Sequence, residues 1–182
     1  YQPNVSTSDN VGYRTLTTHN YQAQQINEVQ LSKISGKPQK FLASLSGEFS
    51  EGAYPTDASL VLKVGAQVMF VKNDPSHEKL FYNGKIGIIQ HMDDDAIYVQ
   101  CEGDDAAIAV TPLTWENRRY TLDAATKEIT ENVIGTFTQI PLKLAWAITI
   151  HKSQGLTFER AIIDAQAAFA HGQVYVALSR CK

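Results

Sequence analysis

Apolar residues at helical spacing mark the first clear element of the chain. A short β-prone stretch at 13–17 precedes them, and from 19 to 34 apolar residues recur near the i, i+3 and i+4 positions of one helix face. Asn20 is a plausible N-cap, and the Ser-Gly-Lys-Pro stretch at 35–38 is a stop signal. The pattern therefore predicts a short strand followed by one helix.

Short β-like stretches replace the helical pattern from about residue 60. Apolar and polar residues alternate over 61–71, and Asn83-Gly84 is a strong turn signal between apolar stretches. Two further strands are predicted around an acidic tip, at 96–100 and 108–110. A run of short strands at close spacing is typical of a small β-barrel.

The pattern changes again near Gln139. A mostly apolar segment at 142–154, ended by Gly155, predicts a largely buried helix with a glycine cap. A buried strand is predicted at 160–164 and a second helix at 172–178.

The order of these elements is α/β, then β, then α/β. It predicts an α/β domain that is interrupted by an inserted β-barrel, with no internal repeat. The expected boundaries are a polar lead-in at 1–12, the interrupted domain at 13–70 and 139–182, and the insert at 71–138.

Composition narrows the class of protein. The chain has 182 residues, of which 43% are hydrophobic and 19% charged, as in ordinary soluble domains. No apolar run approaches the roughly 20 residues that span a bilayer, and no signal peptide opens the chain, so we expect no membrane association. Two cysteines, Cys101 and Cys181, form no disulfide framework or metal-ligand spacing, which favours a reducing cytoplasm and no metal site. Because the chain does not begin with Met, we expect an excised fragment or a processed product.

The charge is unevenly distributed. The formal net charge of −3 argues mildly against nucleic-acid binding. The acid is concentrated in mid-chain, however, at Asp93, Asp94, Asp95, Glu102, Asp104 and Asp105. The last forty residues are close to balanced, so net charge alone excludes nothing.

Two segments carry candidate chemistry. In the first, TIHKSQGLTFE at 149–159, polar and flexible residues follow buried apolar sequence, and such a cluster suits contact with phosphates. The alternative is a solvated helix end with a glycine cap. In the second, GQVYVALSR at 172–180, an apolar helix ends in Arg180, which suits an arginine finger; the alternative is an arginine that interacts with helix-terminal carbonyls.

In this order and at this spacing, the two segments resemble the fifth and sixth motifs of superfamily 1 DNA helicases of the RecD and Pif type. The likeness extends upstream to the family's fourth-motif region at 17–20, with Ala23 and Asn27, and to the lead-in of its SH3-like insert at 62–74 and 83–87. It covers the chain from about residue 13 to 182. The resemblance implies a second RecA-like motor domain that is interrupted by a small SH3-like β-barrel.

The resemblance also implies roles for single residues. Those expected along single-stranded DNA are His151, Lys152, Ser153 and Gln154, with His19 and Asn20 as less specific matches that are equally explained by helix capping. Those expected at the nucleotide are Gly155, Thr157, Glu159, Gln173 and Arg180, of which either Thr157 or Glu159 approaches the ribose and Arg180 is the catalytic arginine finger. Tyr175 also matches the motif, and packing or domain coupling explains it equally well.

One family feature is absent from the sequence. No G-x-x-x-x-G-K-[ST] loop occurs in the chain, so ATP and Mg²⁺ are expected to be bound mainly by an N-terminal RecA-like domain of the same parent chain. The parent is expected to be a monomeric ATP-dependent helicase that moves 5′ to 3′ on single-stranded DNA and unwinds duplexes in repair and recombination. The chain alone is not expected to hydrolyse ATP.

Other readings stay open. A non-enzymatic module that binds nucleic acid or protein has the same outline, and a nuclease-associated subunit of the RecD kind has the same motifs. Most aromatic residues are expected to fill the barrel, and a stacking surface for bases is the alternative; they are Tyr54, Phe70, Phe81, Tyr82, Tyr98, Trp115 and Tyr120. The acidic group at 93–95 is expected to be a solvated hairpin tip rather than a cation site.

Overall fold

The computed structural model describes residues 14–122, 129–156, 161–163 and 171–181. The chain divides into two compact units. The first unit comprises residues 1–34 and 144–182, and the second unit comprises residues 35–143, so the second is inserted between two segments of the first.

The first unit contains a small parallel sheet and two described helices. One helix follows the first strand, and the other follows the last strand. Its strands run in the order β12-β1-β13, and both neighbours pair with β1 in parallel. Its elements are β1 (Arg14–Thr17), α1 (Asn20–Lys33), β12 (Ala147–Thr149), β13 (Ala161–Ile163) and α2 (His171–Leu178). This confirms the predicted strand at 13–17 and the predicted helices at 19–34 and 172–178, while β13 is half-buried rather than fully buried.

Helix α1 begins one residue earlier than a side-chain cap at Asn20 requires. The N-cap is His19, in an extended conformation and without a side-chain capping bond, and Asn20 is the first helical residue. The N-cap interpretation of Asn20 was therefore wrong. The helix ends at Lys33, before Gly36, whose φ of 114° is a conformation that glycine adopts without strain.

The segment predicted as a helix at 142–154 is instead two short strands and a turn. Strand β11 (Leu142–Leu144) joins a sheet of the second unit, β12 follows, and turns occupy 150–155. The prediction failed because a short apolar run has no distinguishing period. Pairing with β1 buries all three residues of β12, and two of them, Ile148 and Thr149, are β-branched.

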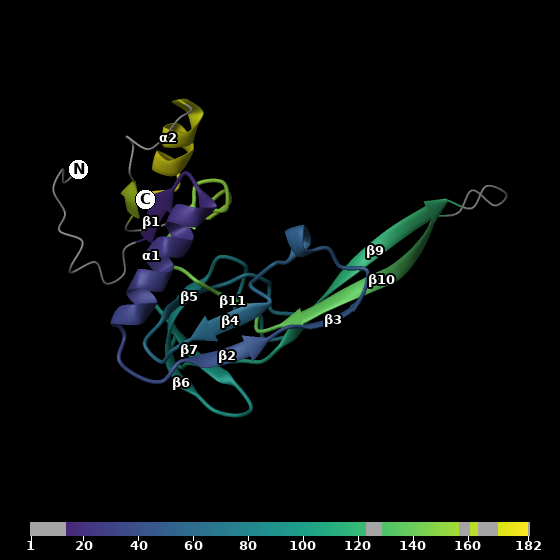
Figure 1. The fold of residues 1–182 in the computed structure, drawn as a ribbon, viewed down its shortest axis with the longest axis horizontal. Helices are drawn as coiled ribbons and strands as arrows, with labels where there is room; N and C mark the ends of the chain where they lie inside the picture. The colour runs from purple at the N-terminus through teal and green to yellow at the C-terminus, as the bar shows by residue number, and fades with distance from the viewer. Residues whose placement is uncertain (1–13, 123–128, 157–160, 164–170, 182) are drawn as a thin grey trace. The chain divides into compact units, whose positions relative to one another are not determined.

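The described strands of the second unit form three sheets (Figure 1). They are a two-stranded sheet of β2 (Gln39–Leu42) and β4 (Ser59–Leu62); a five-stranded sheet of β11, β5 (Gln67–Phe70), β6 (Ile86–Met92), β7 (Ile97–Cys101) and β8 (Ile108–Val110); and a three-stranded sheet of β3 (Ser44–Gly47), β10 (Ile129–Gln139) and β9 (Leu113–Leu122). In these sheets the pairs β2–β4, β3–β10, β9–β10, β5–β6, β6–β7 and β7–β8 are antiparallel. A 3-10 helix, η2 (Glu51–Ala53), follows β3. The strands predicted around residues 61–71, 96–100 and 108–110 are confirmed.

The boundaries of the second unit differ from the predicted insert. The insert was expected at 71–138, whereas the compact unit begins at Ser35 and ends at Lys143. The reason is strand pairing: β2 pairs with β4, and β5 pairs with β6, so both early strands belong with the antiparallel part of the chain.

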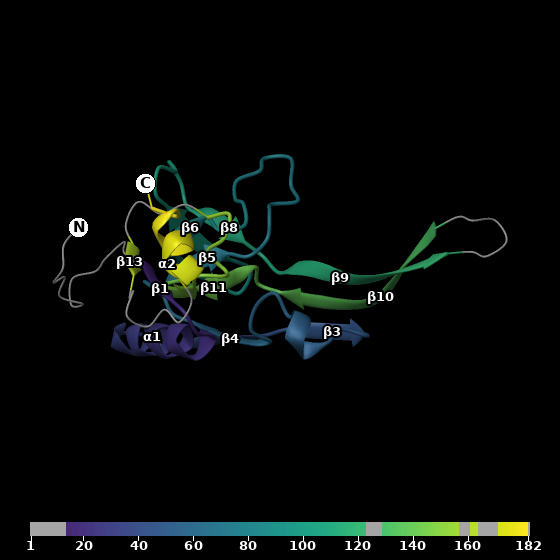
Figure 2. The ribbon, with the colours of Figure 1, turned by 90° about the horizontal axis from the view of Figure 1, so that it is seen from above.

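A long hairpin of β9 and β10 was missed by the sequence analysis. The two strands pair from Leu113–Gln139 to Leu122–Ile129, with a bulge at Ile134 (Figure 2). Next to the bulge, β3 approaches so closely that a Cβ on Gly135 would lie 2.2 Å from the Glu48 carbonyl oxygen. Most residues of this ribbon are polar, and apolar residues do not alternate with them regularly. The sequence therefore has no clear two-residue hydrophobic period here.

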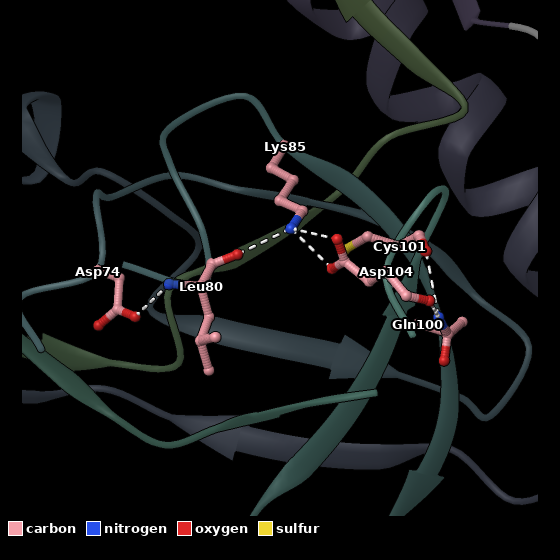
Figure 3. A network of polar contacts seen from close by, with 6 residues as sticks. All are labelled: Asp74, Leu80, Lys85, Gln100, Cys101 and Asp104. Atoms are coloured by element: carbon pink, nitrogen blue, oxygen red, sulfur yellow. Dashed lines mark hydrogen bonds and ion pairs between the residues drawn. The ribbon is translucent and has the colours of Figure 1, made fainter. Parts of the chain in front are cut away.

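The loop before β6 is held by a polar network (Figure 3). The buried Asp74 carboxylate accepts backbone N–H bonds from Ser76 and Leu80, and the Lys85 ammonium donates to the Leu80 carbonyl and to Asp104. The loop ends in the predicted turn at Asn83-Gly84, where Gly84 has a φ of 98°. Positive φ at the second of the two central residues alone is typical of a type II turn.

The prediction that aromatic residues fill the interior of the second unit is confirmed for Phe70 and Phe81, whereas Tyr54, Tyr98 and Trp115 are half-buried. Phe70 and Phe81 are buried and stacked at 4.4 Å between ring centroids, and Trp115 lies edge-on to Phe137. Tyr82 and Tyr120 depart from the prediction because both are exposed.

The acidic residues at 93–95 form the predicted hairpin tip. The Asp93 carboxylate accepts the N–H groups of Asp95 and Ala96, which lower its pKa. The described residues contain no group of three or more His, Cys, Asp or Glu side chains suited to a metal ion. Nor does any helix in the described ranges have the length and apolar character to cross a membrane.

Candidate functional site

Two turns meet at one edge of the parallel sheet in the first unit. Thr17 at the end of β1 is in register with Thr149 at the end of β12, and the Ile150 N–H donates to the Thr17 carbonyl over 2.8 Å. The segments that follow both strands therefore start side by side. In open α/β sheets, ligands bind at the carboxyl ends of parallel strands.

The first turn is held by its own threonines. The Thr17 hydroxyl donates to the His19 carbonyl over 3.2 Å, and the Thr18 hydroxyl is hydrogen-bonded to His19 Nδ1 at 2.8 Å and to the Gln22 side chain at 3.3 Å. Both threonines are buried, whereas His19 and Asn20 are exposed. This places the two predicted residues on the surface at the strand ends.

The second turn, at residues 150–155, presents three of its predicted side chains to solvent. His151, Lys152 and Gln154 are exposed, as is Gly155, whose φ is 82° and whose Cβ position faces open space. The Lys152 N–H donates to the Thr149 hydroxyl over 3.4 Å, which ties the turn to the end of β12.

Ser153 has a different position from its neighbours. It is 0% exposed, and its hydroxyl donates to the Ile150 carbonyl over 2.7 Å. Its N–H donates to the carbonyls of Thr149 and Ile150. Ser153 therefore shapes the turn from inside, and its hydroxyl is not open to a passing strand.

The two turns share a favourable electrostatic composition. Residues 17–22 and 149–156 contain no Asp or Glu and include Lys152, although the whole chain has a net charge of −3. A polyanion approaching this edge meets exposed amide, imidazole and ammonium groups without a facing carboxylate from either turn.

Arg180 follows the second helix of the first unit. Helix α2 buries Ala177, and the Arg180 N–H donates to the Ala177 carbonyl over 3.2 Å. The guanidinium is half-buried, and its Nε and Nη2 donate to the Ser179 hydroxyl over 3.2 and 3.0 Å. The hydrogen bonds described for Arg180 do not connect it to the β1–β12 edge, so the structure unites the predicted DNA residues without uniting them with the arginine.

Three further residues were predicted to lie at the nucleotide, namely Thr157, Glu159 and Gln173. Thr157 and Glu159 lie outside the described residues. Gln173 lies within α2. The sequence contains no phosphate-cradling glycine-lysine loop.

Asn27 is a site-forming residue whose role sequence reasoning missed. Its side-chain amide donates to the Ala147 carbonyl over 2.9 Å, and its Oδ1 accepts the Ala147 N–H over 2.9 Å. The amide also donates to the Leu144 carbonyl over 3.4 Å. This pair of bonds fixes α1 against β12. A signal was present, because Asn27 lies four residues after Ala23 on the buried face of the helix, where a polar residue needs a partner.

Comparisons with known proteins agree on one kind of relative, although no protein-family model matches the sequence. The chain is 34% identical over 178 residues to the human ATP-dependent DNA helicase PIF1, which covers 96% of this chain and 26% of that protein. It is 38% identical over 124 residues to the ATP-dependent DNA helicase Pif1 of Campylobacter jejuni, covering 66% of this chain and 27% of the relative. The chain thus spans about a quarter of the length of these relatives.

Solved structures give the same result. The structure aligns with Bacteroides sp. Pif1 in complex with ADP-AlF4 at a TM-score of 0.85 and 40% identity, covering 97% of this chain and 39% of that one. It aligns with Bacteroides Pif1 bound to single-stranded DNA at a TM-score of 0.75 and 41% identity, covering 93% and 38%. The mixed, strand-rich α/β fold is therefore that of one part of these helicase structures.

Proposed function

The chain is homologous to the Pif1-type superfamily 1 DNA helicases over most of its length, and from this we propose that it is part of an ATP-dependent helicase. In this proposal the first unit is the second of two RecA-like motor domains, and the second unit is an SH3-like barrel inserted into it. The chain then carries half of a DNA track and half of an ATP site. The parallel sheet of the first unit and its interruption by residues 35–143 support the assignment.

The observation that carries the proposal is the meeting of two turns at the carboxyl edge of the sheet. The DNA track consists of His151, Lys152 and Gln154 from the second turn with His19 and Asn20 from the first. These side chains are exposed and offer ammonium, imidazole and amide groups, which suit contacts to phosphates and sugars without base readout. Ser153 supports them by holding the second turn.

Arg180 is the proposed arginine finger. ATP, when bound with Mg²⁺ mainly by the preceding domain, supplies the phosphoryl chemistry. The Arg180 guanidinium provides positive charge for the γ-phosphate, and its only described side-chain acceptor is the neutral Ser179 hydroxyl, so no described carboxylate competes for it. Gly155, Gln173 and either Thr157 or Glu159 complete this half of the site.

In this proposal, movement along DNA results when the two motor domains alternately tighten and release their contacts with the strand. Closure around the nucleotide tightens one pair of contacts, and opening releases it, so the strand advances in steps. We propose that the movement runs from 5′ to 3′. The test compares duplexes that carry a single-stranded tail only at the 5′ end or only at the 3′ end, and the 5′-tailed duplex should be the one that is unwound.

One crossed experiment separates the two half-sites. In the full-length helicase that contains this chain, Arg180→Ala should lower DNA-stimulated ATP hydrolysis by about 10³-fold or more while single-stranded DNA binding stays unchanged. Lys152→Ala should do the reverse, weakening DNA binding and reducing the slope of log affinity against log salt concentration by about one.

Arg119→Ala is the matched control. Arg119 is an exposed arginine of the second unit that pairs with Glu48, and its loss should change neither readout. Undiminished ATP hydrolysis by the Arg180 variant contradicts the finger assignment. An unchanged salt slope for the Lys152 variant contradicts the DNA track and favours a non-enzymatic module.

A further inference from the structure

A tyrosine stands exposed at the start of helix α1. Tyr21 is 64% exposed, although the same helix buries Ala23 and Asn27 against the sheet. It is the second residue of the helix, directly after His19 and Asn20 at the carboxyl end of β1. A large ring at such a position contributes little to the core of the first unit and is accessible to a ligand.

The ring beside it is held in place. His19 Nδ1 is hydrogen-bonded to the buried Thr18 hydroxyl at 2.8 Å, and the His19 and Tyr21 rings lie 5.4 Å apart between centroids with a 45° tilt. About two turns further along α1, the Asn27 bonds to β12 hold the helix against the sheet. Because the two rings are pre-oriented, the protein loses little additional side-chain entropy when a ligand stacks on them.

The surroundings select the kind of ligand. The neighbours of Tyr21 on the helix are the polar residues Asn20, Gln22, Gln24 and Gln25, so the ring is not part of a wide apolar patch that a protein partner would need. An isolated ring among amide groups suits a nucleobase, which has a flat apolar face and hydrogen-bonding edges. The adjoining turn at 150–155 offers the groups that suit the phosphates.

We propose that His19 and Tyr21 form a stacking shelf for one base of single-stranded DNA. The proposal rests on the DNA track described above and adds a base contact to its phosphate contacts. Tyr21 supplies the exposed ring face, and His19 sets the orientation of that ring.

The test is a binding cycle in the full-length helicase. Tyr21→Leu keeps apolar volume but removes the ring, and Tyr21→Phe keeps the ring. The affinity of each variant is measured in the absence of ATP for an unstructured oligonucleotide. It is then compared with the affinity for oligonucleotides that carry a single abasic site at successive positions. Tyr21→Leu should weaken binding to the intact strand by about tenfold, while Tyr21→Phe should change it less than twofold.

The cycle identifies stacking by non-additivity. At one position of the strand, the abasic site should remove most of the effect of Tyr21→Leu, since the ring then has no base to contact. Leu42→Ala, at an apolar residue of the second unit that is 70% exposed, is the control and should bind all strands like the unaltered protein.

Other results overturn the shelf. Equal weakening by Tyr21→Leu at every abasic position indicates a general structural effect, and unchanged binding excludes a base contact. A raised KM for ATP with unchanged DNA binding assigns the ring to the nucleotide base instead. Failure of the DNA track itself is distinguishable, because it appears as an unchanged salt slope in Lys152→Ala, whichever result Tyr21 gives.

Discussion

The two units differ in how their described charged side chains are arranged, although both contain buried polar side chains that bind the backbone. In the second unit, opposite charges pair with one another: at the surface Arg118 lies 2.6 Å from Glu116 and 2.9 Å from Glu131, and in a part-buried pair Lys85 lies 2.7 Å from Asp104. Hydrogen bonds from Arg118 and Tyr120 lower the pKa of Glu131. Buried polar side chains bind backbone groups in both units, and in the first unit they do so at the turns and strands of the candidate site.

The difference has a functional meaning. Thr17, Asn27 and Ser153 use their polar groups to hold the backbone, so the turn geometry does not depend on the exposed side chains. His19, His151 and Gln154 remain on the surface at turns that contain no acid. A surface of mutually paired charges suits a rigid accessory unit, whereas a backbone-braced edge suits ligand contact.

The largest expected effect is on the packing of the second unit. Gly135→Ala places a Cβ 2.2 Å from the Glu48 carbonyl oxygen, so β3 and β10 must separate locally. We expect destabilisation of about 3 kcal/mol, measured by urea denaturation. Gly52→Ala, whose Cβ meets nothing within 4 Å, is the control and should change stability by less than about 0.5 kcal/mol. A small effect at Gly135 means that the ribbon yields easily and is not a rigid accessory.

A smaller effect should come from the brace of the first unit. Asn27→Ala leaves the Ala147 N–H and carbonyl without their side-chain partner, and a loss of about 2 kcal/mol is expected. Hydrogen exchange should show lost protection at the Ala147 amide. The exposed Gln24→Ala on the same helix should not affect it. Retained protection there contradicts the brace and weakens the contrast between the units.

The smallest effect concerns a buried carboxylate of the second unit and depends on pH. Burial alone raises the pKa of Asp74, but the hydrogen bonds from Ser76 and Leu80 and the charge of Lys79 outweigh it, so the pKa is lowered. The stabilisation is therefore present above the unfolded pKa of about 3.9 and is lost as pH falls through the folded pKa.

Asp74→Asn should cost about 1 to 2 kcal/mol at pH 7, and the difference should shrink steadily below pH 4. Denaturation at a series of pH values measures it, with the exposed Asp94→Asn as the control. A difference that is constant with pH shows that the amide loses packing rather than charge-assisted bonds.

The sequence predicted those helices, strands and turns whose formation depends mainly on neighbouring residues in the chain. Helix α1, helix α2, the strands around the acidic tip and the turn at Asn83-Gly84 follow from spacing and turn chemistry. The β9–β10 ribbon was missed because its outer residues are exposed on both faces, so no alternation arises.

The sequence proposes the residues of the candidate site, whose roles stay predictions, but it does not show how the turns that carry them are built. The exposed His151, Lys152 and Gln154 stand where the motif placed them in sequence, on a turn rather than on a helix end. Ser153 looks like its neighbours in sequence, and only its burial and its bond to Ile150 distinguish it. Asn27 carried a signal, but its partner at Ala147 lies 120 residues away.

By itself, the sequence determined the types of residue available for chemistry, the absence of a phosphate-cradling loop, and most local elements. Tertiary structure decided that residues 147–149 form a strand, because pairing with β1 and the Asn27 side chain satisfy their backbone groups and the strand buries their side chains. It also decided that His19 and His151 share an edge. Thr17 and Ile148 are 131 residues apart in the chain, and no local pattern encodes a parallel register between segments so distant.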